Sequence, residues 1–459
     1  MSFQIGAARE EIVITEDMFP FGFGRGMSFT GIHDPLFVRV ILLQNPQTTV
    51  LLIGLDLDSM GHIDFWKQKI RQVIDIPEEN IYMMATHNHE SIHIRNDKDD
   101  APEGDADTAK SEALVWSALE KALRGAQSRL QPGRVCFDTG LCDININREV
   151  QYQGGYMIGR NLHGPSDKTV ALLRFEDLQG HPLAFFINYA VHGSIMAEME
   201  GAGEMLISGD LPGRTSAIVE TYYGPDVVAV WTSGAAGNQD ARYRAVRILP
   251  DENGRPYYGN YGTDAGYALI DMQARDLAEE VIRVSEQMQP GSAEAVLQSR
   301  QTVCVVPGKD HGRGPMGPGG PGDTGGAVGP GGPGGPGPGM MGPRPVEPEE
   351  DPQHPRDLES ETEDRVTVHV GLLQIGDTVL SCYSGEQTYE LGQMVKRALG
   401  EHAPHVVVVS HCNGYIGYMA DVTGFERRVR SALVSLLAKG QAEKVVVSTP
   451  LRLAKEMGL

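Results

Sequence analysis

The chain has 459 residues, and 41% of them are hydrophobic, which is enough for a large buried core. It carries 39 basic and 61 acidic side chains, a formal net charge of −22. Because nucleic acids and anionic membrane surfaces recruit clusters of Lys and Arg, this balance argues against both as partners.

Short apolar runs rich in β-branched residues alternate along the chain with longer amphipathic stretches. The apolar runs predict β-strands at residues 37–43, 49–55, 81–85, 135–139, 169–175, 183–190, 227–231, 366–373, 378–383 and 405–410. The amphipathic stretches predict helices at residues 63–74, 108–126, 214–222, 267–288, 387–399 and 425–439. This alternation predicts an α/β fold, with a mixed β-sheet core flanked by helices.

Residues 307–356 interrupt the alternation because glycine and proline dominate their composition. Such a segment cannot bury enough apolar surface to offset its backbone entropy. We predict a flexible Gly/Pro-rich insertion there, within one catalytic domain made of residues 1–306 and 357–459. A plain linker between two domains remains the alternative.

Histidines follow two of the predicted strands. His87 and His89 come directly after the strand at 81–85, and His192 comes after the strand at 183–190. Residues two apart in an extended segment point the same way, and neutral imidazole is a common zinc ligand. The pattern favours a metal site, although surface or hydrogen-bonded histidines remain the alternative for each motif alone.

Three later motifs also follow strands or enter helices. The segment 207–214 places Asp210 near a helix N-terminus, where a carboxylate is favoured. The Gly-rich segment 233–240 is either an anion site made of backbone amides or a plain loop. Glu386 follows the strand at 378–383 and is either a first-turn carboxylate or a metal ligand.

The cysteines and the first residues indicate a compartment. Five cysteines without a CxxC pair favour reduced thiols over a disulfide framework. We find no signal peptide and no apolar run of roughly 18 residues that would span a membrane. We therefore expect a soluble, cytoplasmic protein, and the sequence leaves open whether it forms a homo-oligomer.

In their order along the chain, these motifs resemble the catalytic domain of the neutral, non-lysosomal ceramidase family. The matching segments are Gly31–Arg39, Thr86–His89, Asn147–Arg148, Asn188–Gly193, Ile207–Asp210, Gly385–Glu386 and Asn413–Tyr418. The resemblance implies a neutral-ceramidase-like catalytic domain that covers the chain to about Tyr418. It further implies a bound Zn²⁺ with the ligands His87, His192, Glu386 and Tyr418. His89, Arg148 and Tyr415 would line the pocket around the scissile group.

The chain also departs from that family. Asp240 stands where the ceramidases have the serine implicated in amide cleavage. The sequence shows no secretion signal, and too few residues follow Tyr418 for the ceramidases' C-terminal immunoglobulin-like domain. These departures argue against membrane sphingolipid as the substrate.

We therefore expect a zinc-dependent hydrolase that uses metal-activated water on an amide or ester bond of a soluble, polar small molecule. Asp240 or Glu90 would transfer protons in place of the serine. Two alternatives remain: metal-dependent cleavage of a glycosidic or other C–O bond, and a non-catalytic homologue that binds a metal or ligand. The complete set of four metal ligands argues against the non-catalytic homologue.

Overall fold

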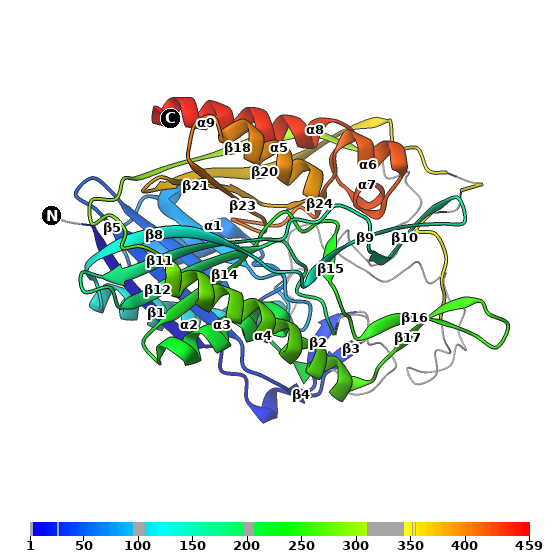
Figure 1. The fold of residues 1–459 in the computed structure, drawn as a ribbon, viewed down its shortest axis with the longest axis horizontal. Coiled ribbons are helices and arrows are strands. Elements are labelled where there is room, and N and C mark those ends of the chain that lie inside the picture. Colours follow the sequence, from blue (N-terminus) through cyan, green and yellow to red (C-terminus); the bar gives the residue numbers. More distant parts are fainter. Residues whose placement is uncertain are drawn as a thin grey trace.

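A computed structural model describes residues 3–24, 27–94, 106–196, 206–309, 344–350, 352–353 and 355–459. The chain forms an α/β fold in which two mixed sheets stack face to face between outer layers of helices (Figure 1). None of the helices in these residues combines the length and apolarity needed to cross a membrane.

The larger sheet has the strand order β14-β12-β11-β8-β1-β5-β6-β7. In chain order its strands are β1 (Gln4–Glu11), β5 (Phe37–Gln44), β6 (Thr49–Leu55), β7 (Ile81–Ala85), β8 (Gln131–Leu141), β11 (Thr169–Asp177), β12 (Pro182–Tyr189) and β14 (Val228–Ser233). The smaller sheet has the order β18-β20-β21-β23 and consists of β18 (Leu297–Lys309), β20 (Glu361–Ile375), β21 (Thr378–Tyr383) and β23 (His405–Val409). Apolar side chains from both sheets form one buried cluster between them.

Helices cover the outer faces of the two sheets. The helices over the larger sheet are α1 (Ile63–Arg71), α2 (Ala106–Ser128), α3 (Asp210–Tyr223) and α4 (Thr263–Gln287). The helices over the smaller sheet are α5 (Tyr389–Leu399) and α9 (Thr449–Met457). Figure 1 shows α5 and α9 at the top of the molecule and α2 to α4 on the opposite side.

Shorter elements surround one end of these layers. They are β2 (Phe21–Gly24), β3 (Met27–Phe29), β4 (Gly31–Ile32), β9 (Asn145–Tyr152), β10 (Gly155–Asn161), β13 (Leu206–Ile207), β15 (Gln239–Ala241), β16 (Val246–Pro250), β17 (Pro256–Asn260), β19 (Arg344–Pro345), β22 (Glu386–Gln387), β24 (Tyr418–Met419), α6 (Val422–Arg427), α7 (Arg430–Val434) and α8 (Gln441–Glu443). Together β9, β10 and β15 form a separate three-stranded sheet.

Three parallel strand pairs position the site. In each pair a helix connects the two strands: β6 to β7 through α1, β12 to β14 through α3, and β21 to β23 through α5. Loops that follow the carboxyl ends of parallel strands are the usual place for ligands in α/β proteins. The histidine motifs and Glu386 follow strands of these pairs, whereas Asp210 follows the short strand β13.

Each predicted strand is present, and the predicted α/β fold is confirmed. The single helix predicted over residues 425–439 is wrong. Arg428 adopts a left-handed φ of 58° between α6 and α7, which ends the first short helix. The strand β1 was not predicted from the sequence, because its small residues have low strand propensity. The small residues let α2 pack closely on the strand. A side chain at Gly6 would clash with the Ala126 carbonyl of α2.

The prediction of a flexible insertion falls mostly on residues 310–343, outside the residues that the structure describes. The ends that are described belong to the fold. Residues 307–309 continue β18 along β20, and β19 pairs with β17. Val346 is buried, and Glu350 forms an ion pair with Arg428. The described residues at both ends of the predicted insertion are therefore structured, and its central part lies outside the described residues.

Candidate metal centre

The segments that follow β7, β12, β21 and β23 meet at one edge of the stacked sheets. Asn88 forms a β-bridge with Gly193, which brings the segments of His87 and His192 together. The short strands β22 and β24 pair in parallel, with Glu386 opposite Tyr418. All four ligands that the family resemblance implies therefore lie in one buried cluster.

The donor atoms of this cluster lie at metal-ligand spacing. His87 Nε2 is 3.5 Å from Glu386 Oε1, and His192 Nε2 is 3.0 Å from Glu386 Oε2. Tyr418 Oη lies 3.4 Å from His192 Nε2. Two ligands that each lie about 2.1 Å from a zinc ion are roughly 3–4 Å apart, so these separations suit one ion.

Backbone carbonyls orient both imidazoles. His192 Nδ1 lies 2.8 Å from the Ala236 carbonyl oxygen and 3.1 Å from that of Gln239, so it is the protonated nitrogen. His87 Nδ1 lies 3.2 Å from both the carbonyl and the carboxylate oxygens of Asp58. Partners of this kind turn the unprotonated Nε2 toward a metal.

Asp58 was not predicted from the sequence, although it lies three residues after β6 and so follows a strand like the other motifs. Burial acts to raise the pKa of Asp58, but His87 and His89 outweigh it and leave that pKa well below its usual range. Burial likewise acts to lower the pKa of His87, whereas Glu386 and Asp58 raise it to about 9. Metal binding would displace that proton.

His89 and Tyr415 lie beside the donors. His89 Nε2 is 3.2 Å from His87 Nε2 and 3.7 Å from the Asp58 carboxylate. Burial and the neighbouring His87 lower the pKa of His89 to about 3, so its imidazole is neutral. The Tyr415 hydroxyl donates a hydrogen bond of 2.5 Å to Glu386 Oε1.

A further histidine, His411, was also missed from the sequence. It follows β23, is buried, and stacks on His87 with ring centroids 4.0 Å apart and an interplanar angle of 13°. Two groups of residues have ligand atoms that all lie within 4.8 Å of one another and could hold a metal ion. One is His87 with His89 and His192, and the other is His87 with Glu386 and His411. Nitrogen and oxygen donors of this kind suit zinc, among other transition metals.

Arg148 lies at the rim of the centre, as the resemblance implies. Its guanidinium donates to Tyr418 Oη at 2.8 Å, to the Gly237 carbonyl at 2.8 Å and to Asp240 Oδ1 at 3.2 Å. Burial raises the pKa of Tyr418 to about 12, although Arg148 acts in the opposite direction. A metal ion bound to the Tyr418 oxygen would, like Arg148, lower the pKa of Tyr418.

Asp240 is held by two arginines. Its second carboxylate oxygen accepts a hydrogen bond of 3.1 Å from Arg244. Burial acts to raise the pKa of Asp240, but Arg244 and Arg148 outweigh it and lower that pKa to about 2. A carboxylate that two guanidinium groups stabilise is a weak base, which suits a role in holding Arg148.

Glu90 lies apart from the donors. Its side chain is buried, and no hydrogen bond joins its carboxylate to another described residue. Burial and the nearby Asp210 raise its pKa to about 8. Asp210 lies in the first turn of α3, as the sequence predicts, and its carboxylate accepts hydrogen bonds from the backbone amides of Leu211 and Met196.

The turn at residues 233–240 contacts the site through carbonyl groups. The Ala236 and Gln239 carbonyls accept from His192, and the Gly237 carbonyl accepts from Arg148. The amides of Gly237 and Gln239 already donate to other carbonyls. These two amides are therefore not available to bind an anion, and for them the alternative of an anion site in this turn is wrong.

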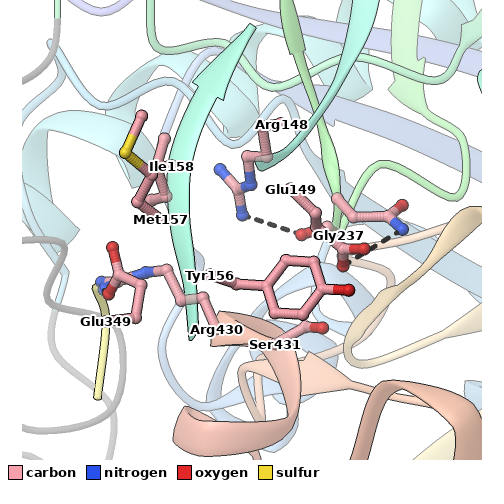
Figure 2. Close-up of a pocket in the computed structure, with 10 residues that line it drawn as sticks. Arg148, Glu149, Tyr156, Met157, Ile158, Gly237, Glu349, Arg430 and Ser431 are labelled. Atoms are coloured by element: carbon pink, nitrogen blue, oxygen red, sulfur yellow. Dashed lines mark hydrogen bonds and ion pairs between the residues drawn. The ribbon is translucent and has the colours of Figure 1, made fainter. Parts of the chain in front are cut away.

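A small pocket lies next to Arg148. Its lining comes from β9, β10, the 233–240 turn and α7, and it consists of Arg148, Glu149, Tyr156, Met157, Ile158, Gly237, Asn238, Glu349, Arg430 and Ser431. Figure 2 shows these side chains gathered around the pocket, with the bond from Arg148 to the Gly237 carbonyl. Charged groups of both signs line it, and Arg430 pairs with Glu349 at 2.6 Å.

Comparisons with known proteins identify the family and the fold. Residues 3–239 match the family described as "Neutral/alkaline non-lysosomal ceramidase, N-terminal". Neutral ceramidase 1 of Arabidopsis thaliana is 27% identical over 210 residues, which cover 42% of this chain and 26% of that relative. The chain thus matches about a quarter of the length of this curated relative.

Two solved structures share the fold. A ceramidase complexed with C2 superimposes with a TM-score of 0.72 at 15% identity, over 100% of this chain and 75% of that chain. Neutral ceramidase from Pseudomonas aeruginosa superimposes with a TM-score of 0.70 at 16% identity, over 99% of this chain and 75% of that chain.

Proposed function

Because the chain belongs to the neutral/alkaline non-lysosomal ceramidase family, we propose that it is a zinc-dependent hydrolase of an amide or ester bond in a soluble, polar small molecule. The proposal depends mainly on one contact. His192 Nδ1 donates to backbone carbonyls, so the lone pair of its Nε2 faces Glu386 Oε2 at 3.0 Å. Two acceptors at that distance repel each other unless a cation lies between them.

The surrounding residues would support hydrolysis. A zinc ion bound there would act as a Lewis acid and supply an activated water at neutral pH. Arg148 is buried and fixed by Asp240, so it can donate to negative charge that develops on a carbonyl oxygen. Tyr415 would hold the Glu386 carboxylate in its orientation.

The lining of the pocket supports a polar substrate. Glu149, Glu349 and Arg430 lie around it, so polar groups of a substrate would find charged partners there. The replacement of the family's serine by Asp240 points the same way, because the contacts of Asp240 are with arginines. We therefore expect negligible hydrolysis of ceramide.

Metal content is the first test. Purified protein should contain about one zinc ion per chain by elemental analysis, and His192→Ala should lose it. His181→Ala is the matched control, because His181 is exposed on a turn after β11 and, among the described residues, its side chain pairs with Asp177 alone. Full zinc retention by His192→Ala would refute the metal centre.

Substrate class is the second test. Zinc-loaded protein should hydrolyse soluble N-acyl amino acids or small esters and should lose this activity with a chelator. A panel that also contains aryl glycosides and ceramide separates the alternatives. Turnover of glycosides alone would move the function to C–O bond cleavage, and efficient turnover of ceramide would contradict the polar-substrate proposal.

A further inference from the structure

His411 occupies a constrained position directly behind His87. Its carbonyl accepts from the Ala85 amide at 3.1 Å, and its own amide donates to the Gly385 carbonyl at 3.4 Å. Its backbone has a left-handed φ of 53°, and that of His87 is 57°. Non-glycine residues persist in this conformation where the surroundings impose it, often at functional sites.

The ligand atom of His411 lies within the reach of a metal. It is within 4.8 Å of the ligand atoms of His87 and Glu386, and all three residues are buried. Two donors that each lie about 2.1 Å from one ion are at most about 4.2 Å apart. A small closure around an ion would therefore bring the three atoms into one ligand set.

Two polar atoms in this group have no hydrogen-bond partner. His411 Nδ1 and Glu386 Oε2 are both buried, and no donor or acceptor in the described residues satisfies either atom. Buried polar atoms without partners are rare because each loses its hydration without replacement. Stacking on His87 would explain an aromatic ring at this position, but a phenyl ring stacks equally well and leaves no unsatisfied nitrogen.

From these observations we propose that His411 is a further protein ligand of the metal centre, beside His87 and Glu386, whose ligand atoms lie within 4.8 Å of its own. This inference rests on the proposed metal centre and adds a ligand to it. Tyr418 keeps its contact with Arg148 at the opposite side of His192. With His87 and His192 this makes three nitrogen ligands, whereas the ligand set that the family resemblance implies has two.

X-ray absorption at the zinc edge of the wild-type protein counts imidazole ligands directly. We expect three, and a count of two in protein that contains zinc would overturn the assignment of His411. This measurement needs no variant and does not depend on activity. Wild-type protein that binds no zinc at all would refute the proposed function as well.

A variant gives the second readout. His411→Phe keeps the stacked ring and removes the nitrogen, so its zinc dissociation constant should rise by about 100-fold or more, and its Co²⁺ absorption spectrum should change. His369→Phe is the matched control, because His369 lies on β20 outside both donor groups. An unchanged Co²⁺ spectrum and affinity in His411→Phe, with zinc still bound by wild type, would reduce His411 to a packing residue. If His411→Phe fails to fold, the imidazole count is repeated in His89→Phe: a count of three keeps His411 as a ligand, and a count of two removes it.

Discussion

At the scale of single residues, two roles are open to the Asp240 carboxylate: proton transfer, or positioning of Arg148. The family resemblance places it where the ceramidases have a serine, which suggests proton transfer. Its contacts are ion pairs with Arg148 and Arg244, and they lower its pKa to about 2. The contacts favour a positioning role, in which Asp240 holds the guanidinium that faces the reacting carbonyl.

Asp240→Asn tests this role. We expect the variant to keep its zinc, to unfold with a free energy lower by about 1–3 kcal/mol, and to show a raised KM, because Arg148 loses a charged partner. Loss of a proton-transfer group would instead lower kcat by about 10²–10⁴-fold. Steady-state kinetics with zinc content checked separate the two. Arg244→Met is the control, since it leaves the bond from Asp240 to Arg148 in place.

At the scale of elements, the centre depends on how closely the 233–240 turn approaches β22. The Gly237 amide donates to the Gln387 carbonyl at 2.8 Å. A Cβ at Gly237 would lie 3.0 Å from the carbonyl oxygens of both Glu386 and Gln387, which are backbone atoms and cannot rotate away. A side chain here would therefore press on β22, the strand that carries Glu386, a proposed metal ligand.

Gly237→Ala should move β22 and weaken the centre. We expect a zinc dissociation constant raised by about 10-fold or more, measured by chelator competition, with the far-ultraviolet circular dichroism unchanged. Gly213→Ala in α3 is the control, because its added Cβ would meet only ordinary contacts, the nearest being Asp56 Oδ2 at 3.4 Å. Equal zinc affinity in the two variants would show that the turn does not position Glu386.

At the scale of the whole molecule, the two sheets and their outer helices enclose separate buried apolar clusters, and the site lies where both sheets end. The proposed ligands come from both sheets: His87 and His192 from the larger one, and Glu386 and Tyr418 from the segments beside the smaller one. Any change that separates the sheets should therefore release the metal.

The Gly/Pro-rich segment should contribute little to this scaffold. Replacing residues 312–342 with a Gly/Ser linker of equal length should change the thermal unfolding midpoint by less than about 2 °C, because neither composition forms a core. Val346→Ser is the comparison, since Val346 is buried and should cost stability. A large loss of stability in the linker variant would show that the segment packs.

The sequence by itself was sufficient for the α/β class and for His87, His192 and Glu386 as site candidates. Both follow from local patterns: apolar runs mark strands, and polar residues directly after a strand lie at its end. The family resemblance added Tyr418 and Arg148, which no spacing rule would have selected.

Only the tertiary structure could join His411 and Asp58 to the donors, separate Glu90 from them, and pair Asp240 with Arg244. The reason is physical. Which strand ends become neighbours depends on the order of strands in the sheets and on the stacking of one sheet on the other, and these contacts join residues hundreds of positions apart. A local pattern shows that a side chain is polar and follows a strand, but its partners, and therefore its pKa and its chemistry, come from the packing of distant segments.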